Sequence, residues 1–222
     1  SRSTVWFGYK RYLDLLDPLR RDDQVRVDGF LTNERARCEQ ALDLATAGAR
    51  VALVSSGDSG IYGMSGLALE LWLARQKKER PSFEIHPAIT ALIAAAAKIG
   101  APLMHDFCAI SLSDCLTPWE RIEKRLKAAA EGDFVIAIYN PKSIERNWQL
   151  ETAMKILKKH RASSTPVVIA RQVGRKERID SGPFSTLIGE KEPDSLDRNK
   201  DLGGQETERR QHQNCYRAIP LL

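Results

Sequence analysis

The segment VALVSSGDSGIYGMSGLALELW, residues 51–72, joins an apolar run to a glycine-rich turn and then to a helical pattern. Its first part belongs to the run RVALVSS (50–56), which is typical of a strand buried on both faces of a sheet. A helix is predicted to follow, from about Ile61 to Arg75. A strand, a turn and a helix in this order form the repeating unit of α/β proteins, so this segment predicts the fold class.

Apolar runs and helical patterns alternate through much of the remaining chain. Further helices are predicted over residues 32–47, 90–98, 116–132 and 145–160. Further strands are predicted over residues 83–87, 108–113, 133–141 and 165–173. In the helix 116–132, Thr117 is expected to be the N-cap, Pro118 the first helical residue and Gly132 the end. The pattern predicts an α/β protein with mostly parallel sheets flanked by helices.

The segment KIGAPLMHD (98–106) is the best candidate for a linker, because glycine and proline interrupt a helical pattern there. We therefore expect an N-terminal α/β domain over residues 1–102 and a C-terminal α/β domain over residues 103–222. From about residue 181 the chain is polar, charged and without periodicity, which predicts a loosely attached tail.

The composition of the chain limits the partners and the location that we expect for the protein. The net charge is +5, but the 34 basic residues are interleaved with 29 acidic ones, which favours an anionic small molecule over nucleic acid as partner. No apolar window approaches the ~18 residues of a membrane span, and the first residues lack the pattern of a secretory signal. A cytoplasmic protein with neither membrane nor nucleic-acid partners is the expectation.

The four cysteines, Cys38, Cys108, Cys115 and Cys215, form no CxxC pair. This spacing predicts neither a zinc site nor a disulfide framework, and buried free thiols are the simpler interpretation. The protein is expected to bind no metal of its own.

The glycine turn differs from the common phosphate-binding loops. No lysine follows Gly57, Gly60 or Gly63, so it is not a Walker loop, and the glycines do not fall in the order GxGxxG. Asp58 would also repel a pyrophosphate. The turn suits a ligand that presents hydroxyls, amines or a positive charge, while the alternative is a simple strand-to-helix turn with Asp58 as N-cap.

Four segments together resemble one family. They are GYKRYLDLL (8–16), ALVSSGDSGIYGM (52–64), GAPLMHDFCAISLSDCLTPWERIEKRL (100–126) and IAIYNPKSIERNWQL (136–150). The sequence is similar to the tetrapyrrole methylases, which use S-adenosylmethionine, from about residue 7 to residue 178. The last two segments resemble those members that methylate C17 of precorrin-3B, or of its cobalt-containing counterpart, and contract the ring in cobalamin biosynthesis.

The resemblance implies a two-domain α/β homodimer that binds S-adenosylmethionine in a cleft between the domains. The cofactor-binding residues that it implies are Gly57, Asp58, Ser59, Gly60, Ile61, Tyr62, Thr90, Ala91, Tyr139 and Asn140. Three features depart from the family pattern. The printed sequence starts after the family's first strand and its GxGPGD loop, Ala88 stands where the family commonly has glycine, and the family's closing strands are not recognisable after residue 184.

Methyl transfer with ring contraction needs a positioned acceptor and a proton transfer. His105, Asp106 and Asp114 are the predicted catalytic residues, with His105 or Asp106 preferred as the general acid or base. His105, Asp106 and Asp114 bracket one short predicted strand, together with Ser113, and are expected to face the same cleft. The alternatives are that the histidine is structural and that Asp114 only turns the chain.

The implied substrate is a polycarboxylate tetrapyrrole, which suits a basic protein. Ser113, Lys142, Arg146 and Arg171 are predicted to bind it, since guanidinium groups near strand ends can grip carboxylates in pairs of hydrogen bonds. Trp119 and Trp148 offer the macrocycle a flat apolar surface, or else belong to the core. Two other functions remain open: a catalytically silent or regulatory paralogue that binds the cofactor or tetrapyrrole, and a Rossmann-type oxidoreductase.

Overall fold

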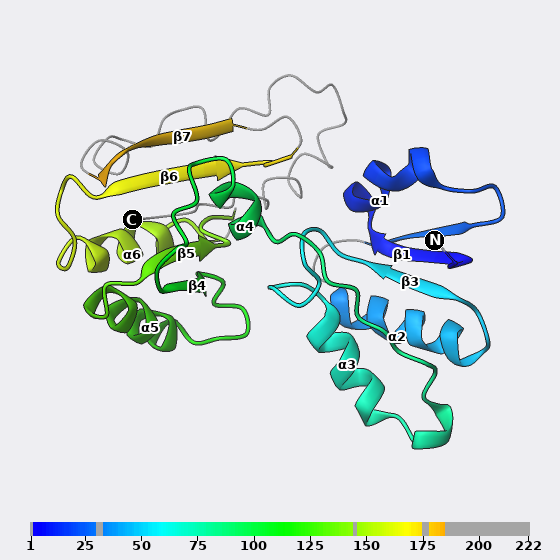
Figure 1. Ribbon diagram of the computed structural model, residues 1–222. Coiled ribbons are helices and arrows are strands. Elements are labelled where there is room, and N and C mark those ends of the chain that lie inside the picture. Colours follow the sequence, from blue (N-terminus) through cyan, green and yellow to red (C-terminus); the bar gives the residue numbers. More distant parts are fainter. Residues whose placement is uncertain (1, 30–32, 144–145, 175–177, 185–222) are drawn as a thin grey trace. The chain divides into compact units, whose positions relative to one another are not determined.

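The structure is a computed structural model that describes residues 2–29, 33–143, 146–174 and 178–184 (Figure 1). It divides into two compact units, Ser1–Thr90 and Ala91–Leu222, each with its own strands and helices. The alternation of strands and helices confirms the α/β class, and three of the four strand pairings in the described residues are parallel.

Unit 1 is built on a three-stranded parallel sheet in the order β2-β1-β3. The strands are β1 (Val5–Tyr9), β2 (Val25–Gly29) and β3 (Val51–Val54). In the register, Val5 pairs with Val25 on one side and with Val51 on the other. β1 is central, so its aromatic residues are buried. The sequence predicted β3 but not β1 and β2, because strands of five residues are defined mainly by their partners in the sheet.

The helices of unit 1 are α1 (Lys10–Leu16), α2 (Glu34–Thr46) and α3 (Ser65–Ala74), with short 3-10 turns η1 (Asp17–Leu19) and η2 (Lys77–Glu79). α2 and α3 pack together through Cys38, Met64 and Ala68. The edge strand β2 is tied to α1 and η1 by Arg26, which forms ion pairs with Asp14, Asp17 and Asp28.

The predicted strand 83–87 is wrong, because these residues form no strand. Four of the five are exposed and no sheet strand pairs with them among the described residues. The helix α3 also begins at Ser65 and not near Ile61. The turn before it is therefore longer than expected.

Unit 2 contains the parallel pair β4 (Phe107–Ser111) and β5 (Val135–Tyr139), and the antiparallel pair β6 (Pro166–Arg171) and β7 (Arg178–Pro183). Its helices are α4 (Ala91–Ala96), α5 (Trp119–Glu131) and α6 (Gln149–Leu157). Figure 1 shows α5 and α6 beside the β4–β5 pair. Buried apolar residues of α5 and α6 form one core with those of β4, β5 and β6; examples are Ile122, Leu126, Leu157, Ile110, Ile138 and Val167.

The division between the units falls at residue 90, whereas the sequence indicated a boundary near 102. The reason is that α4 packs in unit 2: Leu92 and Ala95 lie in a core cluster with Ala137, Tyr139 and Ala170. Regular structure also continues past residue 181, since β7 reaches Pro183. The rest of the predicted tail, 185–222, lies outside the described residues.

The ends of α5 are close to those predicted. Gly132 is its C-cap, as expected, but Pro118 is the N-cap and Trp119 the first helical residue, so Thr117 lies one position too early. Within the described part of the chain, no helix is both long and apolar enough to cross a membrane.

Candidate functional site

The glycine loop, residues 55–64, leads from the carboxyl end of β3 into α3. Its backbone adopts the left-handed conformation at Gly57 (φ 67°) and at Tyr62 (φ 53°). Glycine does so freely and tyrosine does not, so the rest of the loop must hold Tyr62 in place. The side chains of Ile61 and Tyr62 are 41% and 49% exposed. The loop thus presents an apolar and an aromatic side chain at its surface.

The loop is closed by its own backbone around Ser59. The carbonyl oxygen of Ser59 accepts hydrogen bonds from the backbone N–H of Ser65 (3.1 Å) and from its hydroxyl (2.8 Å). At Gly63 the backbone passes so close that an added Cβ would collide with the same carbonyl oxygen. Only glycine therefore fits at position 63 without a shift of the loop.

Asp58 holds the loop to a distant part of unit 1. Its Oδ1 accepts a hydrogen bond from the backbone N–H of Gly60, and its Oδ2 accepts one from the backbone N–H of Ala88, both at 2.8 Å. These donors, Ala88 first and Gly60 second, lower the pKa of the Asp58 carboxyl below its ordinary value because they stabilise the charged form. The interpretation of Asp58 as a helix N-cap is wrong, since Met64 is the N-cap of α3.

The chemistry of the glycine loop suits a ligand without phosphate. Asp58 is its one charged residue, and three serines add hydroxyl groups. A loop with a carboxylate and no lysine or arginine has nothing to neutralise a phosphate, but it can bind amines and hydroxyls. The residues present therefore fit the amino, hydroxyl and sulfonium groups of S-adenosylmethionine.

In unit 2 the carboxyl ends of β4 and β5 meet at one edge, as the register pairs Ser111 with Tyr139. The Ser111 hydroxyl accepts hydrogen bonds from Asn140 Nδ2 (3.0 Å) and from the backbone N–H of Ser113 (3.1 Å). Asn140 has a left-handed backbone (φ 51°), and its carbonyl oxygen accepts a hydrogen bond from Arg146 Nη1 (2.9 Å). Hydrogen bonds to the Ser111 hydroxyl and to the Asn140 carbonyl thus bring together three predicted site residues, Ser113, Asn140 and Arg146.

Asp114 follows at the same edge and is half-buried. Its Oδ2 accepts a hydrogen bond from Nε2 of Gln149 (3.0 Å), the first residue of α6. Gln149 was not among the residues predicted from the sequence. The sequence feature that could have revealed it is its spacing: Gln149 is a polar residue in line with Ala153 and Leu157, which are fully buried on the apolar stripe of α6.

The predicted cofactor residues Thr90 and Ala91 are the last residue of unit 1 and the first of unit 2, and a third, Tyr139, lies in a core cluster of unit 2. Thr90 is buried and Ala91 begins α4. The Tyr139 side chain is 2% exposed, and its hydroxyl oxygen accepts a hydrogen bond from the backbone N–H of Leu92 (2.8 Å). The Tyr139 ring is therefore part of the packing around α4, which leaves Asn140 as the accessible residue of that pair.

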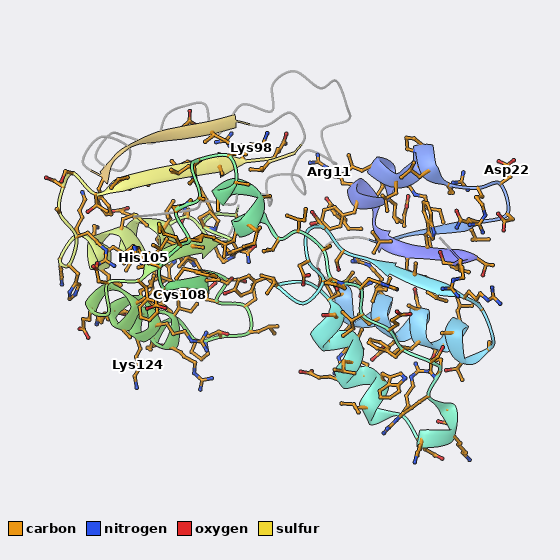
Figure 2. The ribbon with its side chains drawn as sticks, in the orientation of Figure 1. Arg11, Asp22, Lys98, His105, Cys108 and Lys124 are labelled. Carbon is orange, nitrogen blue, oxygen red and sulfur yellow. The ribbon has the colours of Figure 1, made fainter. Side chains whose placement is uncertain are left out.

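The preferred acid–base residues do not join this edge. His105 and Asp106 are exposed and precede β4, whereas Ser113 and Asp114 follow it; Figure 2 shows His105 beside the start of that strand. A five-residue strand is about 16 Å long, so the two pairs lie at opposite ends of β4. Ligand crevices in parallel sheets form at the carboxyl ends, which favours Asp114 among the three predicted catalytic residues.

The predicted substrate residues Lys142 and Arg171 are half-buried, and Arg171 ends β6. Trp119 and Trp148 pack edge to face, with ring centres 4.8 Å apart. Trp119 contacts the core, which is one of the alternatives offered by the sequence, while Trp148 is 44% exposed.

Two of the cysteines, Cys38 and Cys108, lie in surroundings that disfavour the thiolate. Burial raises the pKa of the Cys38 and Cys108 thiols. Cys115 is free and exposed, so the expectation that all are buried is wrong there, and Cys215 lies outside the described residues. In the described part of the chain, no group of three or more His, Cys, Asp or Glu residues is placed to hold a metal ion.

The two parallel sheets, the acidic glycine loop and the polar edge of unit 2 define an α/β protein built for a phosphate-free ligand. A family model of the tetrapyrrole (corrin/porphyrin) methylases matches residues 2–188. The chain belongs to this family.

Individual curated proteins are also similar to this chain. A probable cobalt-factor III C(17)-methyltransferase of Salmonella typhimurium is 51% identical over 77% of this chain and 69% of its own length. A precorrin-3B C(17)-methyltransferase of Sinorhizobium is 47% identical over 81% of this chain and 70% of its own. A cobalt-factor III methyltransferase of Priestia megaterium is 45% identical, and the match covers 33% of it.

Solved structures agree with the fold. The methyltransferase CobJ superposes with a TM-score of 0.80 at 33% identity, covering 99% of this chain and 82% of that one. A uroporphyrin-III C-methyl transferase of Thermus thermophilus, solved in complex with S-adenosyl homocysteine, gives a TM-score of 0.59 at 19% identity over 86% of this chain and 78% of its own. None of these relatives supports a silent paralogue or an oxidoreductase.

Proposed function

We propose that the protein is an S-adenosylmethionine-dependent methyltransferase of cobalamin biosynthesis that methylates C17 of a precorrin-3B-type ring and contracts the macrocycle. The observation that carries this proposal is the 51% identity to a C17-methyltransferase over three quarters of the chain. The glycine loop agrees with it, because its donors and acceptors suit this cofactor and do not suit a nucleotide phosphate.

In this function the glycine loop binds the cofactor. Its backbone and the side chains of Ile61 and Tyr62 face a ligand, while Asp58 keeps the loop closed through Gly60 and Ala88. S-adenosylmethionine, when bound, supplies the methyl group. Methyl transfer is an in-line displacement, so the protein contributes chiefly by holding the acceptor carbon in line with that group.

The polar edge of unit 2 binds and activates the tetrapyrrole. Lys142, Arg146 and Arg171 provide positive charge for its carboxylates, and Ser113 provides a hydroxyl. Asp114 serves as the acid–base group for the proton transfer that accompanies ring contraction. His105 and Asp106, which the sequence favoured for this role, lie at the other end of β4.

The test is methyl transfer from labelled S-adenosylmethionine to precorrin-3B and, in parallel, to cobalt-factor III. The expected product carries one labelled methyl group on C17 of a contracted ring, identified by mass spectrometry and NMR. Calorimetric titration with S-adenosylhomocysteine accompanies the assay. Cofactor binding without methyl transfer to either substrate would exclude the proposed activity, and a difference between the two would identify the natural form.

Assembly and location belong to the same proposal. The resemblance to the family supports a homodimer that works in the cytoplasm, where its small-molecule substrate and cofactor are made. Sedimentation equilibrium of the purified protein measures the first point: the mass of a monomer at micromolar concentration would contradict it.

A further inference from the structure

The Gln149 amide is an unusual group to bury at the start of a helix. Its side chain is 2% exposed, and it occupies a position where apolar residues would extend the buried stripe of α6. Its Nε2 donates to Asp114, but its Oε1 has no hydrogen-bond partner among the described residues. A buried amide oxygen without a partner destabilises a fold, so packing alone does not account for a glutamine here.

A second buried glutamine shows what a structural role looks like. Gln24 in unit 1 is also 2% exposed, but both ends of its amide are bonded to backbone. Its Nε2 donates to the carbonyl oxygen of Ser3 (2.8 Å), and its Oε1 accepts from the backbone N–H of Arg21 (2.9 Å). Gln24 joins two chain segments, whereas Gln149 is bonded to one acidic side chain of the candidate site.

We propose that Gln149 is a positioning residue, which fixes the Asp114 carboxylate so that its second oxygen can exchange a proton with the tetrapyrrole. This inference rests on the proposed function. The bond to Gln149 occupies Oδ2 and settles the rotation of the carboxylate, while Oδ1 has no hydrogen-bond partner among the described residues. No ion pair joins Asp114 to a charged side chain in those residues, so the amide is its anchor.

The proton step is balanced without a further reactant. A hydroxyl O–H bond of the substrate breaks, its proton forms a new O–H bond with Oδ1 of Asp114, and the electron pair stays on the substrate oxygen. The carboxylate becomes a carboxylic acid, and the reverse transfer restores it. Through both steps Nε2 of Gln149 can keep its hydrogen bond to Oδ2.

The experiment measures kcat, KM for S-adenosylmethionine and the pH–rate profile of the full chain with the Q149L, Q149E and Q24L variants. Q149L removes the amide and is expected to lower kcat on the order of 10²-fold, because a small misplacement of a reacting group has that effect. The KM for the cofactor should not change. Q24L is the matched control: it should lower the melting temperature and leave kcat unaltered.

The Q149E variant distinguishes positioning from packing. At low pH the introduced carboxyl shares a proton with Asp114, so it can still donate to Oδ2 and the rate should approach that of the wild type. As the pH rises that proton is lost, two carboxylates face each other, and the rate should fall. A packing role predicts no such pH dependence.

Three outcomes decide the matter. A kcat of Q149L like that of the wild type, or a Q149E profile of the wild-type shape, overturns the positioning role while the methyltransferase activity stands. A wild-type chain that binds the cofactor and transfers no methyl group overturns the proposed function itself. A pH-dependent recovery of Q149E supports both.

Discussion

Two aspartates each follow a strand of a parallel sheet, and their hydrogen-bond partners differ. Asp58 comes after β3 in unit 1, and both of its oxygens accept hydrogen bonds from backbone N–H groups. Asp114 comes after β4 in unit 2, and one of its oxygens accepts a hydrogen bond from a buried side-chain amide. Both oxygens of the first carboxylate hold the loop, whereas the second carboxylate has one oxygen without a hydrogen-bond partner among the described residues. The position of an acid at a strand end therefore does not determine its role, whereas its hydrogen-bond partners do.

The D114N substitution should have the largest effect. The amide has nearly the same shape as the carboxylate but cannot take up a proton, so kcat should fall on the order of 10²- to 10⁴-fold while cofactor affinity is kept. Single-turnover methyl transfer and calorimetry with S-adenosylhomocysteine measure the two quantities. An unchanged rate would remove Asp114 from catalysis and make the two aspartates alike.

The G63A substitution tests whether the glycine loop is built from backbone. The added methyl group meets the carbonyl oxygen of Ser59, so unfolding in urea should show a loss of about 1–3 kcal/mol, together with weaker cofactor binding. G66A is the matched control, because nothing lies within 4 Å of its added Cβ and it stands within α3. That change should stabilise the protein by about 0.5–1 kcal/mol. Equal effects at both positions would contradict the loop geometry.

The D58N substitution separates charge from shape in unit 1. One oxygen remains to accept a hydrogen bond, but the new NH₂ group cannot accept from the second N–H. We expect S-adenosylhomocysteine to bind about tenfold more weakly, with little change in kcat at saturating cofactor. If D58N lowered kcat as far as D114N, the proposed division of roles between the two aspartates would be wrong.

The smallest expected effect is the loss, at acid pH, of the stabilisation that Asp58 gives to the glycine loop. The folded loop lowers the pKa of Asp58, so the stabilisation from its hydrogen bonds is present above the ordinary value of 3.8 and is lost as the pH falls through the lowered value. The amide NMR signals of Gly60 and Ala88 should titrate together with a midpoint below 3.8. The D58N variant should show no such transition, and a midpoint at or above 3.8 would contradict the hydrogen bonds.

Local patterns in the sequence predicted local structure well. The strand, glycine turn and helix around residues 51–75 are present, and α5 ends at Gly132 as its sequence indicates. β1 and β2 were missed because short strands are defined by their neighbours in the sheet. The predicted strand at 83–87 has suitable residues but no partner strand.

Only part of the candidate site could be predicted from the sequence, because the rest depends on contacts between residues far apart in the chain. The acidic character of the glycine loop and the polar residues after β4 and β5 can be read from the sequence. The bond from Ala88 to Asp58 joins residues 30 apart, and that from Gln149 to Asp114 joins residues 35 apart. No periodicity links such positions. His105 and Asp114 bracket one short strand and were expected to face the same cleft, but β4 places them at its opposite ends.

The charge cluster on β2 has a consequence for how the protein behaves in concentrated solution. An open edge of a sheet offers unpaired backbone groups to which a strand of another molecule can add. Among the described strands β2 is such an edge in the sheet of unit 1. It carries Arg26 and Asp28, and Arg26 forms ion pairs with Asp28, Asp14 and Asp17. A foreign strand would have to disrupt these ion pairs, so this cluster opposes the addition of a strand at β2.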